Sequence, residues 1–154
     1  MEASNQVTSP ELSEVRERRR RLRNVALQLE EALALAAGRQ IEWRDTVATA
    51  LARLQDTLDD HIARTEGSGG LFAQIRDDEP RLVSRVAKLG EEHERLRARV
   101  DELLARLRGK VPDVEDVAEI REAGLLLLGL VVRHRQRGSD LLYEAYSVDV
   151  SAMD

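Results

Sequence analysis

The hydrophobic positions of the chain recur at helical spacing in four stretches, and no strand-like alternation competes with them. The first helix is predicted to start at Ser9, before Pro10, and to end near Gly38. The second carries apolar positions from residue 41 to 62, the third runs from a cap at residue 77 or 78 to Gly109, and the fourth opens at Asp113. Residues 65–75 are expected to form a long connection with room for a short helical turn. The pattern predicts an all-α, up-down-up-down four-helix bundle.

Composition agrees with one helical domain. The chain has 154 residues, of which 42% are hydrophobic, 34% charged and 3% aromatic, a mixture that suits helices more than sheets. We expect a disordered N-terminal segment at residues 1–8, the bundle at residues 9–148 and a C-terminal tail at residues 149–154.

Charge and cysteine content exclude several classes of function. A net charge of −5 does not attract nucleic acid to the surface as a whole. The absence of cysteine excludes disulfides, thiolate metal sites and cysteine nucleophiles. The N-terminal residues do not resemble a signal peptide, and the longest apolar run, from Gly124 to Val132, is about half of a membrane span. A cytoplasmic protein without nucleic-acid or membrane partners is expected.

The candidate chemistry lies in the three histidines, each on a different predicted helix. His61 follows Leu58 by three residues, His134 follows Val131 by three, and His93 lies between two leucines of the third seam, so all three face inward. Counted from the turns near Gly38 and Gly109, their heights differ by roughly 6 Å. Each histidine alone suits a neutral, hydrogen-bonded place at the core edge. Together they suit a metal site, because imidazole is the commonest nitrogen ligand for zinc, iron and manganese.

Three short motifs carry a resemblance to a known family. They are LDDHIARTE from Leu58 with Leu71-Phe72 after it, LGEEHERL from Leu89, and VRH from Val132 with Leu142-Tyr143 after it. With these motifs, residues 11–148 resemble the hemerythrin-like, or HHE cation-binding, domains. The resemblance implies a four-helix bundle with a di-iron or other metal site between the helices. It implies iron as the cofactor, with zinc, manganese or no metal as alternatives, and a small diatomic ligand as a partner.

The chain departs from the family's ligand pattern at several positions. Arginine stands where the first helix of the family has a histidine, within the run Glu17–Leu22, and Arg97 stands at another ligand position. After His134 the carboxylate positions hold glycine and serine, with Asp140 one step further. Glu66 is the one well-placed carboxylate. The resemblance therefore implies a reduced set of metal ligands: His61, Glu66, His93 and His134.

Three functions remain open at this point. The first is a hemerythrin-like protein with one metal or a weakened di-metal centre that binds a small ligand or senses oxygen or redox state. The second is a metal-free bundle that serves as a protein-interaction module. The third is an iron enzyme that handles peroxide or nitric oxide, which the missing carboxylates disfavour, and no catalytic residue is assigned. The basic run Arg18–Arg21 is read as a solvated face, or as arginines paired with Glu66 or Glu92.

Overall fold

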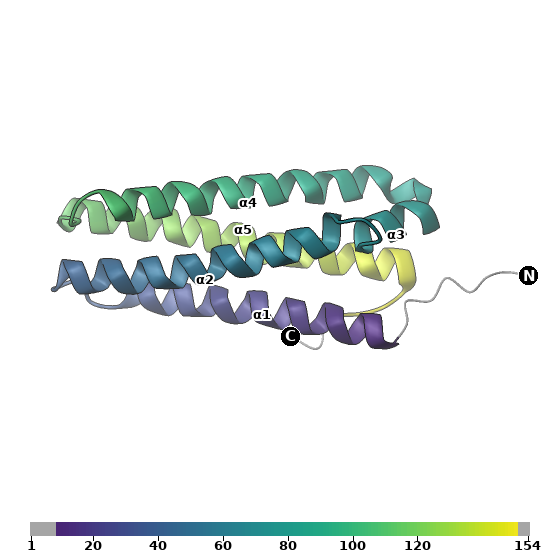
Figure 1. Ribbon diagram of the computed structural model, residues 1–154, viewed down its shortest axis with the longest axis horizontal. Helices are drawn as coiled ribbons and strands as arrows, with labels where there is room; N and C mark the ends of the chain where they lie inside the picture. Colours follow the sequence, from purple (N-terminus) through teal and green to yellow (C-terminus); the bar gives the residue numbers. More distant parts are fainter. Residues whose placement is uncertain (1–8, 151–154) are drawn as a thin grey trace, which may run out of the picture.

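Four long helices lie side by side in the computed structural model, which describes residues 9–150, with side chains from residue 11 (Figure 1). The elements, in chain order, are α1 (Ser9–Ala34), α2 (Gln40–Glu66), α3 (Leu71–Asp78), the 3-10 turn η1 (Pro80–Leu82), α4 (Val83–Gly109) and α5 (Val114–Tyr146). Residues 9–150 contain no strand, so the predicted all-α class is confirmed. The segment expected to be disordered, residues 1–8, and the last four residues of the expected tail lie outside the described residues.

The long helices form a ring in chain order. Helix α1 packs against α2 and α5, and α4 packs against the same two helices from the other side. Short connections between α1 and α2 and between α4 and α5 make successive helices antiparallel, as the up-down-up-down prediction requires. The start of α5 is held by a capping box: the Asp113 carboxylate accepts from the Asp116 amide at 2.9 Å, and the Asp116 carboxylate accepts from the Asp113 amide at 3.1 Å. None of the described helices is long and apolar enough to cross a membrane.

The third long helix begins later than the sequence pattern predicts. Asp77 and Asp78, the predicted caps, form the last turn of α3, and α4 begins only at Val83, after η1. The physical reason is burial: Phe72 and Ile75 of α3 are 6% and 0% exposed, so this segment covers the end of the core as an amphipathic helix. The expected short helical turn is therefore a separate two-turn helix.

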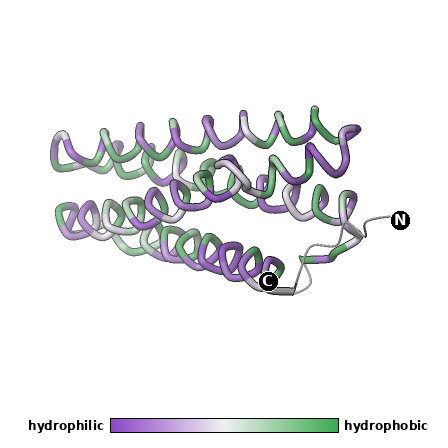
Figure 2. The backbone as a smooth tube through the Cα atoms, turned by 45° about the vertical axis from the view of Figure 1, so that its right-hand side comes forward, coloured by the Kyte–Doolittle hydropathy of each residue, from purple (hydrophilic) through white to green (hydrophobic). Residues whose placement is uncertain are grey.

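The core consists of two apolar clusters separated along the bundle axis by a polar layer. The larger cluster extends toward the end of the bundle that holds the α1–α2 and α4–α5 turns, and it includes Leu29, Leu51 and Val100. The smaller cluster lies at the α3 end and includes Phe72 and Ile75. Each helix alternates between hydrophobic and hydrophilic residues along its length, because one face packs inward and the other meets solvent (Figure 2). Buried polar residues, mainly arginine, histidine and glutamate, lie between the clusters.

The glycine-rich exit from α2 brings α3 back onto the core. Gly69 has a φ of +71°, a left-handed conformation that suits glycine. A Cβ on Gly70 would lie 2.5 Å from the Arg64 carbonyl oxygen and under 3 Å from two more, so only glycine fits there. This turn places Phe72 directly beside the polar layer.

Candidate metal site

Three histidines from three helices converge in the polar layer. His61 of α2, His93 of α4 and His134 of α5 each offer a ring nitrogen, and these three nitrogens lie within 4.8 Å of one another. His93 is fully buried and His134 is 4% exposed. The convergence expected from the helix count is therefore observed, and it uses every histidine of the chain.

His134 is fixed by a carboxylate on the neighbouring helix. Its Nδ1 lies 2.8 Å from Oε2 of Glu92, and Arg137 donates to the other oxygen of the same carboxylate. An ionised carboxylate only accepts, so neutral His134 carries its proton on Nδ1 and presents the Nε2 lone pair to the cluster. Glu92 is 9% exposed, and its charge is compensated by Arg137 and further stabilised by the hydrogen bond from His134.

His93 is fixed in the same way by Glu66. The Nδ1 atom lies 3.1 Å from Oε1 of Glu66, and the ring stacks on Phe72 with 5.5 Å between centroids and 6° between planes. The opposite ring nitrogen, Nε2, is buried and has no hydrogen-bond partner. Such an orphaned acceptor in a buried site is uncommon and calls for an explanation. Space for Glu66 comes from Gly90, where a Cβ would lie 3.2 Å from Oε1.

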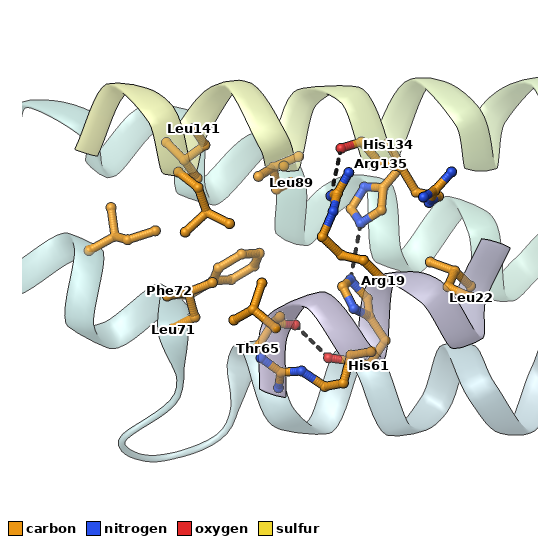
Figure 3. A pocket seen from close by; sticks show the side chains of 15 residues that line it. Arg19, Leu22, His61, Thr65, Leu71, Phe72, Leu89, His134, Arg135 and Leu141 are labelled. Carbon is orange, nitrogen blue, oxygen red and sulfur yellow. Dashed lines mark hydrogen bonds between the residues drawn. The ribbon is translucent and has the colours of Figure 1, made fainter. Parts of the chain in front are cut away.

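His61 closes the cluster from α2. Its Nε2 lies 3.4 Å from Nε2 of His134, and Figure 3 shows the two rings pointing toward one another. Because His134 presents a lone pair there, metal-free His61 donates its Nε2 proton to it. The Thr65 hydroxyl donates to the His61 carbonyl at 2.7 Å, one helical turn on.

Burial keeps the three histidines neutral. It lowers the pKa of His61 well below the ordinary value, and the neighbouring histidines and arginines lower it further. Burial lowers the pKa of His93 to about 4, although the Glu66 carboxylate opposes the shift. The pKa of His134 is lowered by burial too, against the opposing effect of Glu92. Neutral imidazole is the form that binds a metal, so protons do not compete for the site near neutral pH.

The four arginines of the run Arg18–Arg21 divide into two pairs. Arg20 and Arg21 are exposed, as the solvated-face reading expects, and Arg20 pairs with Glu17. Arg18 and Arg19 are each 9% exposed and turn inward, and Arg19 donates to the Arg135 carbonyl at 3.0 Å.

The acids that the sequence suggested as partners for these arginines have other contacts. Glu66 meets His93, and Glu92 meets His134 and Arg137. Two further positions of the family pattern lie apart from the cluster. Arg97 pairs with Asp59 at 3.2 Å, and Asp140 is exposed and accepts from the Gln136 amide.

The comparison with family models gives a match over residues 12–146 to the family described as Hemerythrin HHE cation binding domain. The chain belongs to the hemerythrin HHE cation-binding family. No curated protein matches the chain. No solved structure matches it. Membership in this family agrees with the four-helix fold and assigns the chain to cation-binding helical domains.

The histidine cluster fits a single metal ion of this cation-binding family better than a pair of ions. Tetrahedral zinc with bonds of about 2.0–2.1 Å to nitrogen separates its ligands by about 3.3 Å, close to the 3.4 Å between His61 and His134. The buried Nε2 of His93 supplies the third lone pair. Among the described residues no carboxylate joins the three nitrogens, so nothing there bridges two cations.

Two supporting residues were missed or misread in the sequence. The sequence suggests Glu92 only as a partner for arginine, yet it orients His134. No role for Gly90 is predicted from the sequence. The signal for both was present in the run Gly90-Glu91-Glu92-His93. Glu92, next to the inward histidine, points about 100° around the helix toward a neighbouring helix, and Gly90, three residues before the histidine, lies on nearly the same face as His93.

Proposed function

We propose that the protein binds one divalent metal ion through Nε2 of His61, His93 and His134, and that it uses this centre to bind a small ligand or to sense oxygen or redox state. Iron is the proposed metal, with zinc and manganese as alternatives. Glu66 belongs to the proposed site because its carboxylate holds the ring of His93 through Nδ1. The observation that carries the proposal is the buried Nε2 of His93, which has no partner and faces two further imidazoles.

The carboxylates support this proposal by setting the tautomers. Glu66 and Glu92 each accept from an Nδ1 atom, so two of the three Nε2 atoms already carry lone pairs in the metal-free protein. Such outer carboxylates orient metal-binding histidines and raise their basicity. To bind a metal ion, only His61 would have to change tautomer, with its proton on Nδ1 instead of Nε2, and the three nitrogens would leave a coordination position open for a ligand.

The alternative is a metal-free bundle that acts as a protein-interaction module. The two functions differ in how the cluster responds to metal. Bound metal stabilises the folded chain by mass action, because the unfolded chain has no assembled site. In a metal-free module the cluster is held only by the His61–His134 contact and the two carboxylates, and added metal leaves the melting temperature unchanged.

The test is a calorimetric titration of chelator-treated protein with zinc, manganese and anaerobic iron(II) at neutral pH. We expect one ion per chain for at least one of these metals and a higher melting temperature in its presence. His93→Ala is expected to abolish both effects, because it removes the fully buried ligand. Glu66→Gln is expected to weaken binding by about 10- to 100-fold without abolishing it.

The matched control for Glu66→Gln is Glu91→Gln. This variant changes an exposed carboxylate on α4, the helix that carries Glu92 and His93. This variant is expected to bind metal as the wild type does. Absence of binding by the wild type, or binding that survives His93→Ala unchanged, would exclude the proposed centre and favour the interaction module.

A further inference from the structure

A cavity of about 50 Å³ lies on the α3 side of the histidine layer. One end is polar and is lined by Arg18, Arg19, His61 and Thr65. The other end is apolar and is formed by Phe72 and by leucines of α3, α4 and α5 (Figure 3). A buried water needs roughly 10–15 Å³ of such volume, so the cavity has room for about four water-sized groups. It therefore fits an apolar chain of about four carbon atoms whose charged end lies at Arg18, where the cavity borders a surface groove.

Arg18 is the unusual group at the polar end. The residue is 9% exposed, yet its side chain donates no hydrogen bond to and forms no ion pair with any described residue. Glu14, one turn earlier on α1, and Asp60 compensate its charge only through space, and Arg64 and Arg21 oppose them. No nitrogen of its guanidinium is among the fully enclosed atoms that lack a partner, so water solvates this group where the cavity borders a surface groove. A bound anion would replace that water with charge-assisted hydrogen bonds, which no described residue supplies.

The surroundings of Arg18 favour an anion. The charges of Arg18 and Arg19 both act on His61, which locates them within electrostatic reach of the imidazole. The acids nearest the histidines are already engaged, Glu66 with His93 and Glu92 with His134 and Arg137. The polar end of the cavity is therefore rich in donors and positive charge.

We propose that this cavity binds a short aliphatic monocarboxylate, with the carboxylate on the Arg18 guanidinium and the alkyl chain against Phe72 and Leu141. A guanidinium matches a planar carboxylate through two parallel hydrogen bonds. The apolar wall selects against fully polar anions such as phosphate, which would leave the wall without a partner. The site does not depend on the proposed metal, because Arg18 and the wall contribute no metal ligand.

A surface groove beside the glycine turn adjoins the cavity. Arg18 and Leu71 line both the cavity and this groove, which residues 67–70 also line. Glu11 and Glu14 line the groove as well, and Arg18 is its one basic residue that also lines the cavity, so Arg18 is placed to meet the carboxylate of a molecule that enters from the groove.

The test uses full-length, chelator-treated protein and follows the imidazole proton signals by NMR, since the three histidines are the only ones in the chain. Titration with butyrate is expected to shift the His61 and His134 signals with a dissociation constant on the order of 1 mM. Acetate is expected to bind more weakly because it buries less apolar surface. Phosphate and butylammonium are expected to leave these signals in place.

Arg18→Met keeps the length and apolar stem of the side chain and removes the charge. It is expected to weaken butyrate binding by about tenfold or more and to raise the melting temperature of the ligand-free protein. Arg20→Met, two residues away on the exposed face of α1, serves as the control and is expected to bind as the wild type does.

Three results would overturn the proposal. They are absence of butyrate binding up to about 50 mM, equal binding by Arg18→Met and the wild type, and phosphate binding as tight as butyrate binding. Metal titrations of Arg18→Met separate this site from the metal centre, because the variant is expected to retain metal binding. Failure of the metal centre in the wild type would leave the butyrate result unaffected.

Discussion

Gly90→Ala tests whether the contact between Glu66 and His93 supports the metal centre. Gly90 lies in the interior of α4, where glycine costs about 0.8–1.0 kcal/mol relative to alanine. An added Cβ would lie 3.2 Å from Oε1 of Glu66, so the carboxylate must give by a few tenths of an ångström. The present distance of 3.1 Å from that oxygen to Nδ1 of His93 is already near the upper limit of an ordinary hydrogen bond. The substitution should therefore stabilise the helix and loosen the support of His93.

The two effects have opposite signs and comparable sizes. The free energy of unfolding of the metal-free protein is expected to rise by about 0.5–1 kcal/mol. Loss of a carboxylate that supports a metal-binding histidine costs about 10- to 100-fold in metal affinity. Because Gly90→Ala only shifts Glu66 relative to His93, we expect a loss at the lower limit of that range. A tenfold loss corresponds to about 1.4 kcal/mol, enough to cancel the gain when metal is saturating.

Two measurements separate the effects. Urea unfolding with chelator gives the stability of the metal-free protein, and a zinc titration against a competing chelator gives the affinity. Gly129→Ala is the matched control, because Gly129 is partly buried in the interior of α5 and has no atom within 4 Å of an added Cβ. It should stabilise the metal-free protein similarly and leave the affinity unchanged. Equal metal affinities for the two variants would refute the role assigned to Glu66.

Three further predictions concern stability. The metal-free protein should lose stability as the pH falls from 6.5 toward about 4, because unfolded histidines take up protons that the buried ones refuse; for His93 alone, with a folded pKa of about 4, the loss approaches roughly 3 kcal/mol. Urea unfolding at several pH values should therefore show that the free energy of unfolding changes less steeply with pH in His93→Gln than in the wild type. Equal pH dependence in the two proteins would contradict the lowered pKa of His93. Asp113→Ala should cost about 1 kcal/mol by removing the capping box of α5, whereas Glu115→Ala, exposed in the same turn, should cost less. Leu51→Ala should cost about 2–5 kcal/mol in the same assay, because Leu51 is fully buried in the larger apolar cluster, and a change below 1 kcal/mol would mean that this cluster is not tightly packed.

The four long helices could be read from the sequence because helical periodicity is a local property. Val117, Ile120 and Leu127 of α5 are buried as their spacing predicts, and the capping box begins at the predicted Asp113. The layer of histidines was also predictable, since two short turns fix how many residues separate each histidine from the same end of the bundle.

Details at the ends of helices were decided by contacts between distant residues. The sequence pattern predicts that Asp77 or Asp78 caps a helix. Both instead form the end of α3, because burial of Ile75 stabilises that helix. The resemblance to the family made Glu66 a candidate ligand, and the structure places its carboxylate against the Nδ1 atom of His93 on another helix. Its role in metal binding stays a prediction.

By itself, the sequence determined the class of fold, the inward faces of the helices and the level of the three histidines, because each depends on spacing along one helix. Only the tertiary structure decided which partner each polar side chain meets. Glu92 accepts hydrogen bonds from His134 and Arg137. Arg18 lines a cavity, where no described acid forms an ion pair with it. Such choices depend on the rotation and packing of neighbouring helices, which spacing within a single helix does not specify.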